Sequence, residues 1–505
     1  MKVKIKPALL AGLPIATYSQ LPERPNIIWL MAEDISTDLE CNGMKGVHTP
    51  VLNQLAAEGM FFESAYCTAS ISSPSRSAMM TGVHQNTINA HNHRSNRNLP
   101  LTTEVQPITY HLRNNHYTCL LGHSLVAQKG RKIDCNYKTR DVGSWNGINA
   151  FGLFDKASDF TLQDQPFFAQ IQLVKTHRGN WWKATSQASQ SPVHPDSVEL
   201  PPYMPDHPKV RAQWASYLDQ IEYMDHEVGL IMEDLKKKKL LNNTIIIFIG
   251  DNGRCDIRGK GYLYEPGIKI PMIVWGKGIQ PARIKELVST LDISATILDL
   301  AGCELPDYVM GKPFIEKSTG KFTGGHEYIY SARDNWDEIV DCMRSVTTSR
   351  FKYIKNYVTD QGWDCHQQYL EFHRPAIHVM RQLQKENRLT QAQQLFMAPK
   401  KPAEELYDLK NDLFELHNLA ENPKYKKELQ RMRSYLEDCQ SKHTDDGLQD
   451  LKARLEQSKI QKKEKVSDFV KTHHPDEWEK IEAGEICTKY REYVNEMHRM
   501  NHKQK

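Results

Sequence analysis

Carboxylate and amide side chains follow two apolar segments of the sequence, at the point where each segment ends. Glu33 and Asp34 follow the first segment, and Asp251 and Asn252 follow a later one. Taken singly, each pair fits a helix cap or a turn. Together they supply hard oxygen donors, which suit a calcium-like ion that takes about 6–8 oxygen ligands. We therefore expect these four residues to form a metal site.

Basic and imidazole side chains follow two further apolar segments. Lys175, His177 and Arg178 come after one of them, and His123 comes after the other. In an open sheet of parallel strands, ligands bind beyond the carboxyl ends of the strands. We therefore expect these cations and histidines to lie at the same rim of the sheet as the metal site.

A longer pattern lies at residues 72–82, which read SSPSRSAMMTG. On its own, the proline near the start predicts a helix that begins there. The segment also resembles the signature of the type I, formylglycine-dependent sulfatases, which belong to the alkaline phosphatase superfamily. In that signature Cys or Ser, any residue, Pro, Ser and Arg precede a helix that ends near Thr-Gly. The chain is therefore expected to be a sulfatase.

The resemblance to the sulfatases extends over residues 24–422. Lys260 matches the lysine that holds the sulfate in the family, and His177 falls where the family places the histidine that serves the leaving group. Glu33 is a mild departure, because the family usually has two aspartates there. A larger departure is the segment 122–125, which reads GHSL where most relatives have Gly-Lys-x-His.

This departure changes two contacts with the sulfate. His123 stands at the position of the lysine, and Leu125 stands at the position of the histidine. The resemblance still places His123 near the sulfate or the formylglycine. The sequence does not indicate which residue would take the proton-transfer role of the missing histidine.

The resemblance also implies a mechanism. Ser72 would be oxidised to formylglycine by a sulfatase-maturing enzyme, and the hydrated aldehyde would attack sulfur. The residue at position 72, Ser72, would also be a ligand of one divalent cation, which the resemblance to the family implies is Ca²⁺. Arg76, Lys260 and the helix N-terminus would stabilise the sulfate. His177 would protonate the leaving oxygen. Because the motif begins with serine, a serine-type maturation system is expected.

The substrate class follows less directly. A polar loop with His93 and Arg94, together with Arg178, Arg333 and Asp334, is expected to contact sugar hydroxyls. The loop at Lys260 and a C-terminal motif at residues 404–409 and 415–419 look like heparan N-sulfatase (sulfamidase) and the bacterial glycan sulfatases similar to it. The implied substrate is a sulfated glycan of the glycosaminoglycan or mucin type. The resemblance does not distinguish a substrate with an O-sulfate from one with an N-sulfate.

The elements that must position these residues alternate along the chain. Apolar, β-rich segments suit strands buried on both faces, and they lie at residues 26–31, 117–121, 167–174, 244–249 and 270–275. Helical patterns lie between them, the longest at about residues 210–240. This alternation predicts an α/β fold, an alkaline phosphatase-like, mostly parallel mixed sheet between helices.

Three further segments complete the expected domain organisation. A catalytic domain at residues 24–325 is followed by a smaller α+β subdomain at 326–444, with an antiparallel sheet and a helix. Residues 445–505 carry interspersed charges and are expected to form solvated helices. Residues 1–20, with a basic start and a short apolar region, are expected to be a signal peptide for export to a bacterial periplasm.

Composition excludes some partners. The chain has 65 basic and 62 acidic residues, a net charge of +3, which argues against nucleic-acid binding. Nothing after the N-terminus reaches the roughly 18 apolar residues of a membrane span. Two other functions stay open. One is a phosphoester hydrolase of the same superfamily with an unmodified Ser72, and the other is a catalytically silent sugar-binding relative, suggested by Leu125.

Overall fold

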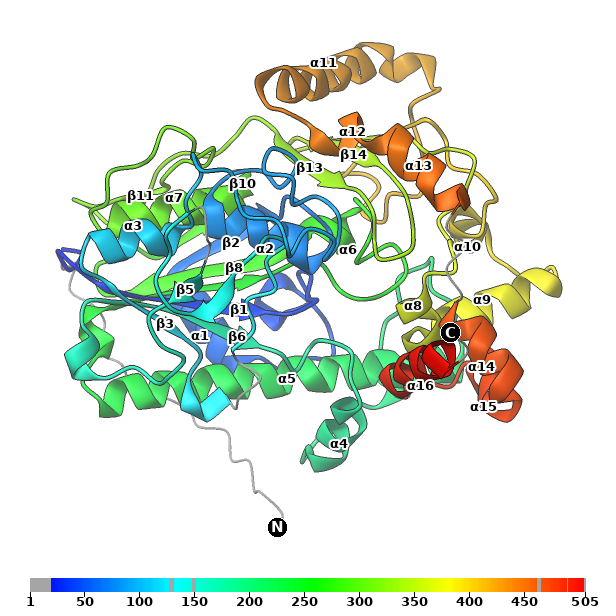
Figure 1. Ribbon diagram of the computed structural model, residues 1–505, viewed down its shortest axis with the longest axis horizontal. Coiled ribbons are helices and arrows are strands. Elements are labelled where there is room, and N and C mark those ends of the chain that lie inside the picture. Colours follow the sequence, from blue (N-terminus) through cyan, green and yellow to red (C-terminus); the bar gives the residue numbers. More distant parts are fainter. Residues whose placement is uncertain (1–19, 127–130, 148–150, 461–464, 488, 504–505) are drawn as a thin grey trace.

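The computed structural model describes residues 20–126, 131–147, 151–460, 465–487 and 489–503. The expected signal peptide at 1–20 lies, except for Gln20, outside these ranges. The core is an eight-stranded sheet (Figure 1). Its strands, in spatial order, are β10 (Val288–Ser289), β2 (Met60–Tyr66), β8 (Lys269–Gly276), β7 (Thr244–Gly250), β1 (Asn26–Ala32), β6 (Phe167–Leu173) and β3 (Thr118–Leu121), and β9 (Ala282–Ile284) pairs with β2.

The sheet is mixed but mostly parallel, as the alternation of strands and helices predicts. β1 lies at its centre and pairs in parallel with β6 and β7. Only β8 runs against its neighbours, β7 and β2. Every residue of β1 and β7 is buried, which explains why these segments are continuously apolar. The predicted fold class is therefore confirmed.

Helices cover both faces of this sheet (Figure 1). One face carries α1 (Pro50–Glu58) and the long α5 (Pro208–Lys237), which contact each other. The other face carries α2 (Ser72–Thr81), α3 (Ile108–Asn114) and α7 (Thr290–Leu300). The shorter elements of this part are β4 (Arg140–Val142), β5 (Gly152–Phe154), α4 (Trp181–Ala188), α6 (Glu265–Ile268), β11 (Ile315–Glu316) and β12 (Lys321–Phe322).

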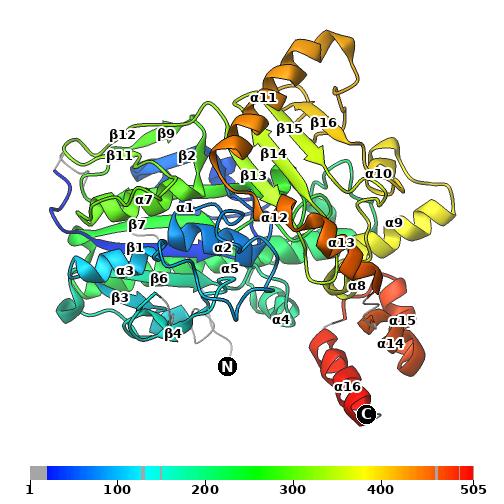
Figure 2. The same ribbon diagram turned by 45° about the horizontal axis from the view of Figure 1, so that its top comes forward.

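A second, antiparallel sheet follows in the C-terminal part, also as predicted. Its strands are β13 (Ile329–Arg333), β14 (Met343–Thr347), β15 (Phe351–Asn356) and β16 (Glu404–Asp408), in that order. The long α11 (Lys426–Lys442) packs on β14 and β15 (Figure 2). Between β15 and β16 the chain forms α8 (Gln368–His373), α9 (Pro375–Lys385) and α10 (Gln391–Phe396).

The charged C-terminal segment is helical but not uniformly solvated. It contains α12 (Asp446–Gln449), α13 (Leu451–Ile460), α14 (Val466–His473), α15 (Pro475–Glu482) and α16 (Tyr490–Lys503). Val470 and Trp478 pack with Phe372 of α8 in a small apolar cluster. The spacing of these apolar residues within a charged segment places them on one face of each helix.

Two further features concern the whole described chain. The ten cysteines all lie within the described ranges, and all are free thiols. Among the described helices, none combines the length and the apolar composition that crossing a membrane requires.

Candidate active site

The predicted oxygen ligands meet at the carboxyl ends of β1 and β7, because these strands are parallel neighbours in register, with Ala32 beside Gly250. The backbone N–H of Asp34 donates to Asp251 Oδ1 at 3.0 Å. The amide of Asn252 donates to Asp34 Oδ1 at 3.1 Å. All of these side chains are buried.

The signature segment forms α2, whose N-terminus points to the same place. The Ser72 hydroxyl donates to Asn252 Oδ1 at 2.9 Å. One turn later, Arg76 Nε donates to Asp251 Oδ2 at 2.9 Å, and its Nη2 lies 3.8 Å from Glu33 Oε1. The whole of α2 is buried, and no side chain caps its N-terminus, so the first backbone N–H groups remain free to bind an anion.

The carboxylates of this site fit a divalent cation. Glu33 Oε1 and Asp34 Oδ2 are buried and accept no hydrogen bond from any residue of the described ranges. A buried carboxylate oxygen without a donor is costly unless a cation takes it up. Oxygen donors of this kind are those that Ca²⁺ and Mg²⁺ prefer. Glu33, Asp34, Asp251 and Asn252 would therefore hold the ion that the sequence predicts.

Two lysines lie against these carboxylates. Lys260 Nζ, which the sequence predicts to hold the sulfate, donates to Asp34 Oδ1 at 2.6 Å. Lys132 Nζ donates to Glu33 Oε2 at 2.9 Å and lies 3.4 Å from Asp134 Oδ2. Lys132 belongs to none of the sequence motifs described above. One signal in the sequence points to it. His123 stands where the motif has lysine, and basic residues follow within the next ten positions.

These cations keep the buried acids ionised. Burial by itself would raise the pKa of Glu33, but Lys132, His177 and Arg76 outweigh burial and hold this pKa below its ordinary value. For Asp34, burial is likewise outweighed, chiefly by Lys260, and the pKa is lowered. The site therefore combines charged oxygen donors with charged nitrogen donors.

His177 faces this cluster from the segment after β6. Its Nε2 lies 3.8 Å from Glu33 Oε2 and 3.8 Å from Asp34 Oδ2. Its Nδ1 lies 2.9 Å from the carbonyl oxygen of Arg178, which assigns the Nδ1 proton to that hydrogen bond and turns Nε2 toward the site. Burial lowers the pKa of His177, while Asp34 and Glu33 act to raise it.

His123 does not lie in this cluster, in contrast to the expectation from the sequence. Its Nε2 is 2.8 Å from Asp234 on α5 and 3.1 Å from Asp159. Its Nδ1 accepts the backbone N–H of Leu125 at 3.1 Å. Both ring nitrogens are thus engaged by local partners, and the ring is fully buried. Two carboxylates hold the imidazole on the α5 side of the sheet, so the geometry gives it no contact with Ser72.

His93 and Arg94 lie beside the first turn of α2. His93 Nδ1 is 3.0 Å from the Ser73 hydroxyl, and the backbone N–H of Arg94 donates to the same oxygen at 3.0 Å. Arg94 forms a bidentate ion pair with Asp134, which Arg97 also contacts. Both arginine side chains are more than two fifths exposed.

The other three expected sugar contacts are held inside the protein. Arg333 pairs with Asp341, and Asp334 accepts from Arg344 Nη2 at 3.1 Å. Arg178 lies over a tryptophan ring, with 4.6 Å from its Cζ to the ring centroid. All three are buried, with internal charge partners or an aromatic partner. The structure therefore does not bring them to the surface beside Ser72.

Comparisons with known proteins agree with this geometry. The sulfatase family model matches residues 25–303, and the model for the C-terminal part of N-sulphoglucosamine sulphohydrolase matches residues 253–396. An ulvan-active sulfatase of Formosa agariphila is 31% identical over 467 residues, covering 84% of this chain and 76% of that protein. Human N-sulphoglucosamine sulphohydrolase is 25% identical, covering 81% of this chain and 89% of its own length.

A solved 2-O GAG sulfatase has the same fold. Its structure matches with a TM-score of 0.58 and 19% identity, covering 84% of this chain and 93% of that one. The sulfatase family model matches more than half of the chain, and the Formosa protein is 31% identical over 84% of it. The chain therefore belongs to the sulfatase family and is a sulfuric ester hydrolase.

Proposed function

We propose that this sulfatase removes sulfate from sulfated carbohydrates with a formylglycine made from Ser72. The observation that carries the proposal is the position of the Ser72 hydroxyl, 2.9 Å from Asn252 Oδ1 at the buried N-terminus of α2. A residue at this point lies between the predicted metal ligands and the cations that would hold a sulfate group.

Oxidation of Ser72 has a chemical reason. A plain serine that attacked sulfur would remain as a stable sulfate ester. A formylglycine hydrate has a second hydroxyl, whose loss of a proton expels the sulfate and restores the aldehyde. A divalent cation held by Glu33, Asp34, Asp251 and Asn252 would supply positive charge to the nucleophile and the sulfate.

The charge of the sulfate oxygens would be held by the chain's own cations. Arg76, Lys260 and Lys132 reach the cluster from three separate segments, and each contacts a carboxylate of the site. The free N–H groups of the first turn of α2 add partial positive charge. Such fixed donors need little reorganisation when charge develops in the transition state.

His177 is the group that we assign to the leaving sugar oxygen. Its Nε2 faces the acids at 3.8 Å while its Nδ1 is fixed by the Arg178 carbonyl. In the neutral ring the single proton is on Nδ1, so Nε2 faces the site as an acceptor. His177 would act as the general acid in its cationic form, in which Nε2 also carries a proton. The exposed Arg94 and Arg97 are linked to the site through Asp134, which lies 3.4 Å from Lys132 Nζ, and they favour a substrate with further negative charge.

The relatives support a glycan as the substrate. One is described as acting on ulvan, another on N-sulphoglucosamine, and a structural neighbour on the 2-O position of GAG. A sulfated polysaccharide fragment is the substrate class that they share. A periplasmic location, expected from residues 1–20, and a separate maturing enzyme belong to the same proposal.

Two measurements test this function. Intact-mass analysis of the Ser72 peptide after maturation is expected to show the loss of two hydrogen atoms relative to serine. Matured protein is expected to release sulfate from at least one member of a panel of sulfated mono- and disaccharides, and Ser72→Ala is expected to release none. An unmodified Ser72 together with hydrolysis of phosphate monoesters in the same panel would overturn the proposal.

One observation favours a second candidate, a silent sugar-binding relative. His123 is bound to Asp234 and Asp159, and Leu125 occupies the position of the family's second histidine. Binding of the panel sugars without sulfate release from any of them would support this candidate.

A further inference from the structure

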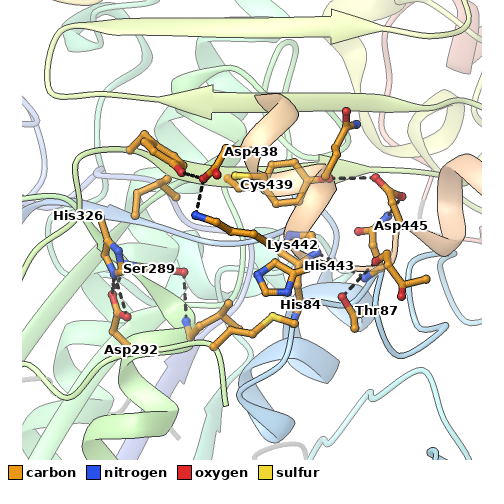
Figure 3. A pocket seen from close by; sticks show the side chains of 18 of the residues that line it. His84, Thr87, Ser289, Asp292, His326, Asp438, Cys439, Lys442, His443 and Asp445 are labelled. Carbon is orange, nitrogen blue, oxygen red and sulfur yellow. Dashed lines mark hydrogen bonds and ion pairs between the residues drawn. The ribbon is translucent and has the colours of Figure 1, made fainter. Parts of the chain in front are cut away.

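A separate cavity of about 350 Å³ lies where the catalytic part meets the C-terminal subdomain (Figure 3). It is lined by the loop after α2, the start of α7, β13 and the end of α11. His84 enters it just beyond the C-terminus of α2, whereas Ser72 stands at the N-terminus. The ten residues of α2 span about 15 Å, so the two places are distinct.

His84 lines this cavity, and its ring has a buried nitrogen without a hydrogen-bond partner among the described residues. The ring is 4% exposed and packs on Tyr330, with 4.6 Å between centroids. Its Nδ1 accepts the backbone N–H of Asn86 at 3.4 Å. Burial lowers the pKa of His84 to about 3, so the ring is neutral and its proton sits on Nε2. Among the described residues, none is a hydrogen-bond partner of that Nε2.

The acids of the cavity already have donors. Asp292 is bound by His326 Nε2 at 2.8 Å and by two backbone N–H groups. Asp445 accepts from Arg344 Nη2 at 2.6 Å. Asp438 accepts from Lys442 Nζ at 2.6 Å and from a tyrosine hydroxyl.

The donors, in contrast, are not all used. Lys442 Nζ contacts Asp438 and has further N–H bonds at the rim, and its side chain is 60% exposed. Figure 3 shows Lys442 and His443 beside His84. Since the lining acids are paired while the His84 N–H is free, the cavity suits a ligand that brings hydrogen-bond acceptors, above all an anionic group.

The size and the remaining lining indicate the rest of the ligand. A volume of about 350 Å³ lies at the lower end of the range for small-molecule sites, about 300–1,000 Å³. Leu291, Met310 and Ile329 give part of the wall an apolar surface. An apolar wall opposite polar donors matches a pyranose, which has C–H faces and an oxygen-rich edge.

We propose that this cavity is a second, non-catalytic binding site for one anionic sugar unit, whose carboxylate or sulfate accepts the His84 Nε2–H and pairs with Lys442. The choice of a sugar rests on the proposed function, whereas the need for an anion rests on the cavity itself. Such a site would hold a neighbouring part of a charged glycan, or another chain of it, while the Ser72 site acts.

Methyl NMR of the full chain tests this site. Met310 lines the cavity, and its Sδ accepts the His84 backbone N–H at 3.3 Å. With [methyl-¹³C]methionine labelling, the Met310 signal is identified by its loss in Met310→Leu. Glucuronic acid and glucose 6-sulfate, added separately, are expected to shift this signal saturably, and glucose is expected not to. A shift by only one of the two acids would identify the anion, carboxylate or sulfate.

Two variants and a matched control make the test specific. His84→Phe keeps the ring on Tyr330 but removes the donor, and Lys442→Gln removes the charge at the exposed rim. Each is expected to weaken binding about tenfold, the usual effect of one hydrogen bond to a charged group. Lys480→Gln, which removes an equally exposed lysine paired with Glu477, is expected to change nothing.

The outcomes separate this site from the proposed function. No Met310 shift, or shifts that are equal in wild type, His84→Phe and Lys442→Gln, would overturn the cavity proposal even if the chain releases sulfate. A saturable shift in a chain that releases no sulfate would support the cavity and contradict the proposed function. His84→Phe is expected to leave sulfate release from a monosaccharide unchanged.

Discussion

Lys132 and Glu33 form an ion pair with 2.9 Å between Nζ and Oε2, although 99 residues separate them in the sequence. The Glu33 side chain is 2% exposed, and that of Lys132 is 26% exposed. The pair brings a second lysine to a site whose motif has histidine at that position. Lys132 thus reaches the site from the segment that follows His123 in the chain.

Replacement of Lys132 is expected to impair catalysis. Lys132→Met should lower kcat/KM for a sulfated monosaccharide by about 10²–10³-fold, because it removes one fixed charge from the sulfate site. It should also tighten Ca²⁺ binding, measured by calorimetry, since Glu33 loses its competing cation. The control is Lys138→Met, an exposed lysine of the same region. A change in kcat/KM of less than threefold would exclude a role for Lys132.

Calcium is expected to stabilise the folded chain. With three carboxylates at the site, Ca²⁺ at about one hundred times its Kd should add about 2.7 kcal/mol to the free energy of unfolding, and a chelator should reverse this. Differential scanning calorimetry gives the corresponding rise in Tm. Asp251→Asn should abolish the rise, whereas Asp256→Asn, a buried carboxylate outside the ligand set, should retain it. An equal rise in both variants would count against the predicted ligands.

His123 is expected to serve stability rather than catalysis. His123→Ala removes the contacts with Asp234 and Asp159 from a fully buried position, so it should cost about 2 kcal/mol or more of unfolding free energy. Urea denaturation measures this cost, with His417→Ala, an 80% exposed histidine, as the control. Because the ring lies away from Ser72, kcat of the folded variant should stay within threefold of wild type. A loss of kcat with intact stability would restore the role expected from the motif.

Glu227 on α5 should make stability depend on pH. Burial raises its pKa from 4.5 to about 8, and Lys175 offsets this only in part. Between these values the folded chain keeps a proton that the unfolded chain has lost, so the free energy of unfolding falls as pH rises from about 4.5 to about 8. Glu227→Gln removes this term, and its stability relative to wild type should increase by more than about 1 kcal/mol over that range.

The control for this pH dependence is Glu233→Gln, which lies on the same helix with 34% of its side chain exposed. Its stability relative to wild type should stay constant with pH. Denaturation midpoints at several pH values measure both variants. Parallel curves for Glu227→Gln and wild type would show that Glu227 is ionised in the folded chain.

Arg97 is expected to select for charged oligosaccharides. Its side chain is 45% exposed beside Arg94, and both pair with Asp134. Arg97→Ala should raise KM for a polyanionic oligosaccharide several-fold, and more at low salt than at high salt, with little effect on a sulfated monosaccharide. Arg140→Ala, an exposed arginine elsewhere, is the control. Equal effects of Arg97→Ala on both substrates would contradict a role in substrate length.

Much of the fold followed from local patterns. Strands β1 and β7 are buried on both faces, so they had to be continuously apolar, and such segments are easy to recognise. The C-terminal tail was harder, because its few apolar residues are spread among charges, and only their packing with Phe372 reveals an apolar cluster. Helical periodicity in a charged segment does not by itself say which surface the apolar face will meet.

The sequence by itself determined the reaction class and predicted the oxygen ligands. Ser72 and Arg76 belong to one contiguous motif, and parallel neighbouring strands necessarily bring Glu33-Asp34 and Asp251-Asn252 to one rim. Only the tertiary structure shows that Lys132 lies in the site and that His123 lies outside it. It likewise decided that Arg178, Arg333 and Asp334 are held inside. These outcomes depend on charge pairing between segments far apart in the chain, and such pairing leaves no local pattern in the sequence.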